Sequence, residues 1–182
     1  MNNTDQSRTE LVTILQSAYS GELAASLAYR GHWKSLDDPV EQGSVREIES
    51  DEWSHRERVG QMLTELGAAP QKRKELVAWL VGRAAGIGCH LTGWLMPMYL
   101  AGRLESSNII EYEHAVAHAS ILGLNLFADD LKAMARKECD HERFFIKMVS
   151  DHRLTPLVQV VFPWPEANGP VHVIPASAEN SG

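Results

Sequence analysis

A spaced pattern of glutamate, tyrosine and histidine occurs twice in this chain of 182 residues, and it limits the fold more than any other feature. In each copy, a Glu is followed seven residues later by a Tyr and, further along, by a Glu-x-x-His sequence. The copies consist of Glu22, Tyr29, Glu52 and His55, and of Glu105, Tyr112, Glu138 and His141. Glu105 lies 83 residues after Glu22, and Glu138 lies 86 residues after Glu52. This near-constant offset indicates a duplicated pair of segments.

The four segments that carry the pattern have apolar side chains at helical spacing, about 100° per residue. We expect helices over about residues 9–34, 39–66, 94–122 and 127–151. Thr9 is suited to cap the first helix, and Asp37-Asp38-Pro39 separates it from the second. Gly67 and Gly123 follow the second and third helices as natural stops. Because no segment alternates with the period of a strand, the predicted fold class is all-α.

The lengths of the connections favour a four-helix bundle. Short loops join the first helix to the second and the third to the fourth, so each pair is expected to be antiparallel. About 30 residues separate the pairs, which suits a long crossover connection with an extra helix of its own. We expect one domain over residues 1–182, with the bundle at about 9–151 and a Pro-rich tail at 152–182. Within the tail, residues 157–164 are expected to pack on the bundle and 176–182 to be disordered.

The glutamates and histidines on the apolar stripes predict a site for two metal ions. A buried carboxylate is costly unless it has a partner or binds a metal. One Glu from each of two helices and a Glu-x-x-His from each of the other two form a carboxylate-bridged pair of ions. Oxygen donors with one imidazole per ion suit iron or manganese. The predicted ligands are Glu22, Glu52, His55, Glu105, Glu138 and His141; the alternative is a buried polar network without metal.

A third Glu-x-x-His, formed by Glu111 and His114, falls outside this pattern. On a helical wheel, Glu111 lies about 120° away from the apolar stripe, and His114 lies nearly opposite to it. We therefore expect this pair at the surface, and Glu105 remains the predicted ligand of the third helix.

Three further side chains are expected to support the ligands. Tyr29 and Tyr112 each lie two turns after a ligand Glu and on its face, which favours a core or supporting role over a radical role. Glu142 lies near the site face, and a supporting role is favoured over a seventh ligand.

The residues that precede the two Glu-x-x-His sequences differ. Asp51 comes directly before Glu52 and is expected to orient His55 by a hydrogen bond. Lys137 stands at the matching position of the second copy, so His141 needs a different partner.

The composition limits the class of protein. The chain is 44% hydrophobic and 23% charged, as is usual for soluble globular proteins. Its formal net charge of −7 argues against nucleic-acid binding, which favours a basic face. Two cysteines, Cys89 and Cys139, form no disulfide framework, and the N-terminal sequence is too polar for a signal peptide. We therefore expect a cytoplasmic protein.

These motifs resemble those of the ferritin-like di-iron superfamily and, within it, the demethoxyubiquinone hydroxylase family. The likeness spans about residues 15–150. It rests on Gly21-Glu22-Leu23-Ala24-Ala25, Tyr29-Arg30-Gly31, Asp51-Glu52-x-x-His55, the Gly-rich apolar connector 76–102, Leu104-Glu105-x-x-x-Ile109-x-x-Tyr112 and Glu138-x-x-His141. Two features depart from the family pattern. Lys137 replaces the usual carboxylate, and the tail is Pro-rich where the family continues in helix.

The resemblance implies a ferritin-like bundle that holds two iron ions, with manganese as the alternative, and hydroxylates a quinol-like ring with O₂. The implied partners are O₂, a hydrophobic quinol and an external electron donor. Because such quinols reside in membranes, the connector 76–102 is expected to lie on the inner membrane surface as a peripheral segment. Burial on the bundle and a homodimer interface are the alternatives.

Three other functions stay open at this point. The first is a ferroxidase or iron-storage subunit, and the second is a rubrerythrin-like peroxide reductase. The third is a helical interaction module without metal.

Overall fold

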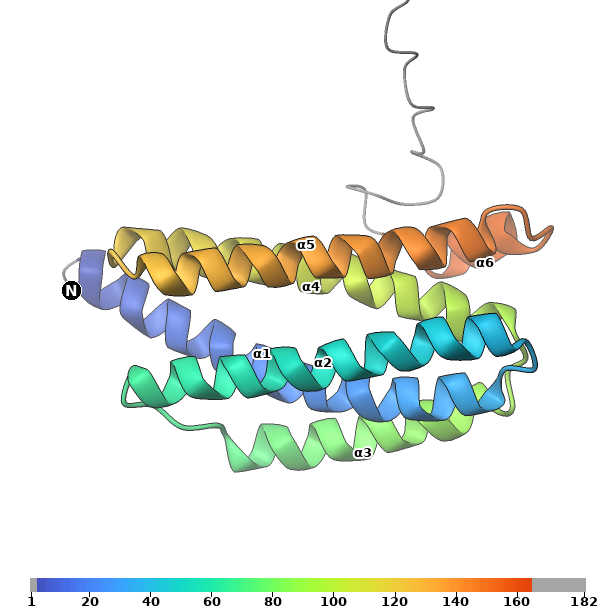
Figure 1. Cartoon of the computed structure of the whole chain (residues 1–182), viewed down its shortest axis with the longest axis horizontal. Coiled ribbons are helices and arrows are strands. Elements are labelled where there is room, and N and C mark those ends of the chain that lie inside the picture. Colours follow the sequence, from blue (N-terminus) through green and yellow to red (C-terminus); the bar gives the residue numbers. More distant parts are fainter. Residues whose placement is uncertain (1–2, 165–182) are drawn as a thin grey trace, which may run out of the picture.

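The computed structural model describes residues 3–164, and this part of the chain is helical and contains no strand (Figure 1). Its helices are α1 (Asn3–Ser35), α2 (Pro39–Glu65), α3 (Lys72–Cys89), α4 (Leu95–Ile121), α5 (Asn125–Val149) and α6 (Thr155–Val161). The prediction of an all-α fold is confirmed for the described residues.

Four of the helices pack as a bundle of two pairs (Figure 1). α1 packs antiparallel to α2, and α4 packs antiparallel to α5, as the short loops predicted. The pairs meet where α1 contacts α4 and where α2 contacts α5. The predicted helix of the crossover connection is α3, which lies along α1 on the outside of the bundle.

The start of α1 differs from the prediction. The helix begins at Asn3, so Thr9 is an interior residue rather than its N-cap, and its hydroxyl donates to the carbonyl of Asp5 at 3.0 Å. The first turns are held by contacts that are distant in sequence. Arg8 donates from Nη2 to the carbonyl of Leu66 at 2.6 Å, for example. Local capping signals therefore placed the helix start too late.

Two apolar clusters fill the bundle, one toward each end. The first contains Leu11, Leu15, Ala18, Val59, Met62, Leu63, Tyr112, Ala115, Ala119, Phe127, Ala128, Leu131, Met134 and Ala135. The second contains Ala25, Tyr29, Leu36, Val45, Ile48, Met98, Tyr99, Ala101, Phe145, Ile146, Val149 and Trp164. The ligand candidates occupy the level between these clusters, because Glu22 lies between Ala18 and Ala25 along α1.

The segment 157–164 packs on the bundle only in part. Trp164 is 5% exposed and meets the ring of Tyr99 edge-on, with the centroids 5.0 Å apart. Leu157 and Val160 are instead 64% and 79% exposed. The expectation for the whole run was therefore wrong, because α6 turns most of its apolar side chains outward. The residues 176–182, which we expected to be disordered, lie outside the described part of the chain.

The outer face of α3 is apolar and exposed. Its exposed large side chains are Leu76, Val77, Trp79, Leu80, Val81 and Ile87. Within residues 3–164, no helix combines the length and the hydropathy that are needed to cross a bilayer. Contact of the segment 76–102 with a membrane or a partner chain stays a prediction.

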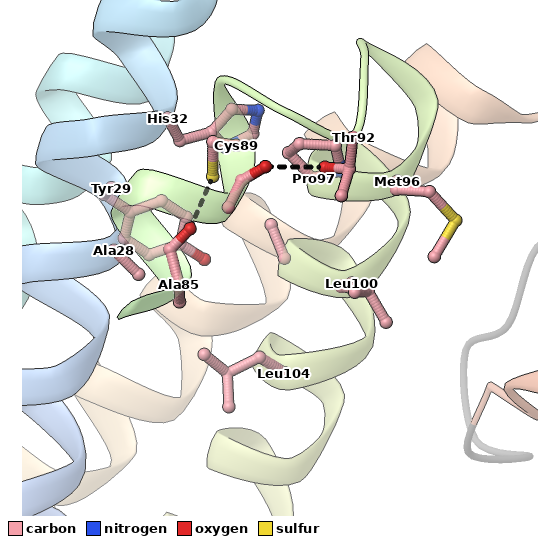
Figure 2. A pocket seen from close by; sticks show the side chains of 12 residues that line it. Ala28, Tyr29, His32, Ala85, Cys89, Thr92, Met96, Pro97, Leu100 and Leu104 are labelled. Atoms are coloured by element: carbon pink, nitrogen blue, oxygen red, sulfur yellow. Dashed lines mark hydrogen bonds between the residues drawn. The ribbon is translucent and has the colours of Figure 1, made fainter. Parts of the chain in front are cut away.

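An apolar cavity of about 280 Å³ lies between α1, α3 and α4 (Figure 2). Its buried side is formed by Tyr29 and His32 of α1 and by Pro97 and Ala101 of α4. Its rim contains exposed residues of α3 and α4, among them Ala85. The outer helix thus forms one wall of a cavity that would otherwise be open.

Glycine makes the close approach of α3 to α1 possible. A Cβ atom on Gly82 would lie 2.5 Å from the carbonyl oxygen of Ala24 and 2.8 Å from its Cα atom, both backbone atoms that cannot move aside cheaply. Gly88, in the same helix, has open space around its Cβ position.

We expect Gly82→Ala to lower the melting temperature by about 3–10 °C, since crowding of this kind costs about 1–3 kcal/mol. The matched variant Gly88→Ala should leave the melting temperature unchanged or raise it, because Ala favours a helix over Gly. Thermal unfolding followed by circular dichroism measures both. Equal melting temperatures for the two variants would contradict the packing of α3 on α1 described above.

Candidate metal centre

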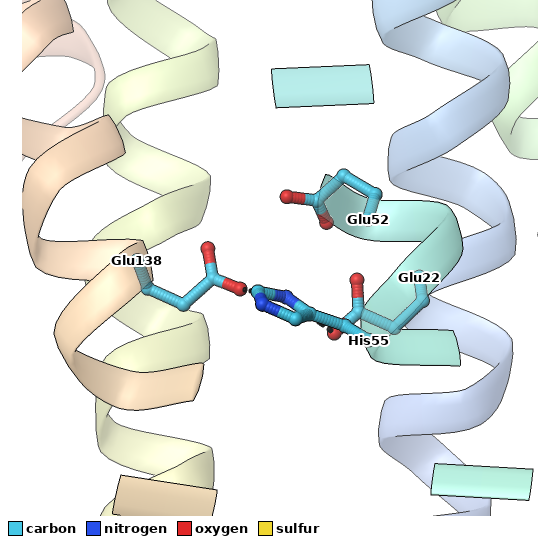
Figure 3. A group of neighbouring side chains, drawn as sticks. All are labelled: Glu22, Glu52, His55 and Glu138. Carbon is cyan, nitrogen blue, oxygen red and sulfur yellow. Dashed lines mark ion pairs between the residues drawn. The ribbon is translucent and has the colours of Figure 1, made fainter. Parts of the chain in front are cut away.

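The structure brings the six predicted ligands to one level of the bundle interior. Glu22 comes from α1, Glu52 and His55 from α2, Glu105 from α4, and Glu138 and His141 from α5; all six are at most 7% exposed. Figure 3 shows Glu52, His55 and Glu138 converging on the space between the helix pairs.

The donor atoms form two groups that share two glutamates. One group contains Glu22, Glu52, His55 and Glu138, and the other contains Glu52, Glu105, Glu138 and His141. Within each group, one donor atom per residue lies within 4.8 Å of all the others. Each group therefore has one histidine and one glutamate of its own, and Glu52 and Glu138 lie where they can bridge two ions. The groups can hold metal ions with small side-chain adjustments, since metal–ligand bonds to O and N are about 2.0–2.2 Å long.

The hydrogen bonding of these residues also fits a metal centre. Nine buried side-chain polar atoms in the described residues have no hydrogen-bond partner, and seven of them belong to this site. They include both oxygens of Glu52 and of Glu138 and the Nδ1 atoms of His55 and His141. His55 Nδ1 lies 2.8 Å from Glu138 Oε1, but the contact lacks the geometry of a hydrogen bond. Buried polar atoms are seldom left without a partner, so these atoms are well placed to bind cations.

The electrostatic environment of the four buried glutamates also favours bound cations. Burial raises the pKa of Glu22, although its contact with Glu52 and other neighbours partly offsets this effect. Burial with repulsion from the other carboxylates raises the pKa values of Glu52 and Glu105. Burial also opposes ionisation of Glu138, but its contacts with His141 and His55 lower its pKa below the ordinary value. Four carboxylates would balance two divalent cations in charge. Two ions would thus remove the repulsion that the metal-free site contains.

The two tyrosines of the repeated pattern connect the helix pairs. Tyr29 of α1 donates a hydrogen bond to Glu105 of α4, and Tyr112 of α4 donates one to Glu22 of α1. Each tyrosine therefore supports the glutamate of the other copy and not the one that precedes it in sequence. Burial raises the pKa of both hydroxyl groups well above the usual value, so they remain protonated donors.

Asp51 supports a different histidine from the one we expected. Its Oδ2 atom lies 3.1 Å from His141 Nε2, so it orients the imidazole of α5 rather than His55 on its own helix. Lys137 Nζ lies 3.1 Å from the same oxygen. Asp51 is one residue away from Glu52, which turns it about 100° around α2 and toward α5. Lys137, which breaks the symmetry of the sequence, thus holds the partner that His141 requires.

Glu142 lies outside both ligand groups. It accepts hydrogen bonds from Ser106 and from Trp164 Nε1, the latter at 3.0 Å. Trp164 also donates to Ser106 Oγ at 2.7 Å. Ser106 follows the predicted ligand Glu105, and Glu142 follows His141, so Trp164 contacts the side chains next to two of the predicted ligands. Ser106 and Trp164 were not predicted from the sequence, because nothing in the spacing indicates that a segment after α5 returns to the site.

The third Glu-x-x-His stays away from the donor groups, as its helical phase predicted. His114 is exposed, as we expected, but Glu111 is partly buried rather than at the surface. Burial and the nearby charge of Glu22 raise the pKa of Glu111 to about 7. His114 therefore offers a control position on the same helix as Glu105.

No protein-family model matches the chain, and a search of curated proteins finds no significant relative. The family resemblance therefore rests on the motif residues, and the candidate metal centre rests on the geometry of the two donor groups.

We expect Glu52→Gln to abolish binding of both ions, because Glu52 belongs to both donor groups. Glu105→Gln changes only one group and should leave about one ion per chain, whereas His114→Ala should keep two. Inductively coupled plasma mass spectrometry of the purified, iron-loaded variants measures the metal content. Two ions per chain in Glu52→Gln would show that the ligands are misassigned.

The metal-free protein should be less stable at pH 8 than at pH 5.5. Folding raises the pKa values of Glu52 and Glu105 above 4.5, the ordinary pKa of a Glu side chain. Such a carboxyl group contributes its full stabilisation when the pH is below its unfolded-state pKa. This contribution is lost as the pH rises through its pKa in the folded protein. Glu138, with its lowered pKa, adds no pH dependence in this range.

We expect the metal-free melting temperature to fall by at least about 4 °C between these pH values, which corresponds to roughly 1–2 kcal/mol. The metal-loaded protein should show the opposite order, because the ions bind deprotonated carboxylates. Differential scanning calorimetry of both forms measures the effect. A metal-free protein that melts higher at pH 8 would contradict the account of the buried carboxylates.

Proposed function

We propose that this protein is a ferritin-like di-iron mono-oxygenase that hydroxylates a hydrophobic, quinol-like molecule with O₂. The observation that carries the proposal is the pair of donor groups that share Glu52 and Glu138. A shared pair of carboxylates holds two ions close together, as two-electron chemistry with O₂ requires. The motif resemblance to the demethoxyubiquinone hydroxylase family supports the choice of substrate class.

The side chains around the site suit a reactive centre. A pair of reduced iron ions bound by the six predicted ligands would supply electrons for the reduction of O₂. Tyr29 and Tyr112 hold Glu105 and Glu22 by hydrogen bonds, and Asp51 orients His141. The apolar clusters on both sides of the site keep water away from it, which would limit side reactions there.

The apolar cavity supports a hydrophobic substrate. Tyr29 lines the cavity and also donates its hydrogen bond to Glu105, so one side chain contacts both places. Leu104 lines the cavity and directly precedes Glu105 in α4. A substrate in the cavity would therefore lie next to the group that contains His141. O₂ and an external electron donor are the other partners that the proposal requires.

The test is a reaction of the reduced, iron-loaded protein with ¹⁸O₂ and a short-chain demethoxyquinol. We expect mass spectrometry to find one ¹⁸O atom in the product with the wild type and with His114→Ala, and none with Glu52→Gln. Iron oxidation without a hydroxylated product would indicate a ferroxidase instead. Rapid consumption of hydrogen peroxide without hydroxylation would indicate a peroxide reductase, and either result would overturn the proposal.

A further inference from the structure

One side chain of the apolar cavity is polar, buried and without a partner. His32 is 2% exposed, and its Nε2 atom makes no hydrogen bond. The other polar side chains that line the cavity are already engaged. Tyr29 donates to Glu105, Cys89 donates to the carbonyl of Ala85 at 3.3 Å, and Thr92 donates to the carbonyl of Gly88 at 2.9 Å. Figure 2 shows His32 at the end of the cavity where Cys89 and Thr92 also lie.

The imidazole of His32 is held in place by neighbouring rings. It stacks on Tyr29 at a centroid distance of 6.4 Å and on Phe145 at 6.1 Å, with interplanar angles of 23° and 16°. A ring packed in this way is not free to turn toward another partner. Burial lowers the pKa of His32 to about 4, so the ring is neutral at pH 7. A buried nitrogen without a hydrogen bond lowers the stability of the ligand-free protein. A bound molecule that forms a hydrogen bond with it would remove this free-energy penalty.

The chemistry of the nitrogen selects the polar group of that molecule. Nε2 of a neutral imidazole donates in one tautomer and accepts in the other. A hydroxyl group can do both and therefore fits either tautomer, whereas a carbonyl fits only one. A charged group is disfavoured, because no charged side chain lines the cavity.

The size of the cavity selects the rest of the molecule. A cavity of roughly 150 Å³ with apolar walls holds benzene. The cavity of about 280 Å³ therefore accommodates one ring with short substituents. The rim at Ala85, Thr92 and Leu100 is exposed, so a longer apolar chain attached to the ring can leave through it.

We infer that this cavity binds a phenol- or quinol-type ring whose hydroxyl group hydrogen-bonds to His32 Nε2, which makes His32 the residue that selects the polar end of the substrate. As an identification of the substrate site, the inference rests on the proposed function. Binding of the ring itself requires no metal, so the inference can be tested separately.

The test compares 4-ethylphenol with 4-ethyltoluene, in which a methyl group replaces the hydroxyl group. Isothermal titration calorimetry on the metal-free protein gives both dissociation constants, and their ratio measures the preference for the hydroxyl group. We expect His32→Leu to reduce this preference about tenfold or more relative to the wild type. His32→Gln keeps a polar partner and should retain most of the preference. Ala85→Phe, at the exposed rim, fills the cavity and should abolish binding of both probes.

An unchanged preference in a folded His32→Leu variant would overturn the role of His32. Failure of the wild type to bind either probe, or unchanged binding in Ala85→Phe, would overturn the site as a whole. Because no metal is present, these results are independent of whether the iron-loaded protein hydroxylates a quinol. Binding without hydroxylation would leave the site in place and remove the proposed reaction.

Discussion

The structure depends on four carboxylates that are buried together in the middle of a helical bundle. Glu52, Glu105 and Glu138 are fully buried, and Glu22 is nearly so. Burying one unpaired charge costs several kcal/mol, and four adjacent charges also repel each other. Folding to this structure therefore requires protons or cations in the site. Two divalent cations would balance this charge and would also pair with the oxygen and nitrogen atoms that have no hydrogen-bond partner.

The supporting hydrogen bonds run from one helix pair to the other rather than within one pair. Tyr29 supports Glu105, and Tyr112 supports Glu22. On the other side of the bundle, Asp51 of α2 contacts His141 of α5. These contacts join segments up to 90 residues apart in the chain. The relative position of the two pairs and the geometry of the ligands are thus determined by the same side chains.

Helical periodicity was enough to predict the features that repeat along a single helix. Each ligand lies on the apolar stripe of its helix, and His114 could be excluded by its phase. Features that depend on the relation between helices were not predictable in this way. The contact of Asp51 with His141 depends on the distance between α2 and α5, and the exposed position of Leu157 depends on how α6 turns. His32 lies three residues after Tyr29, and this spacing on one helix face could have indicated its place beside the site.

X-ray absorption spectroscopy of the iron-loaded protein tests the central claim most directly, because it reports the distance between the two ions. The shared glutamates predict a first shell of oxygen and nitrogen atoms and an iron–iron distance of about 3.5–4 Å. A spectrum of isolated iron, without a second iron at that distance, would contradict the paired site and the oxygen chemistry proposed for it.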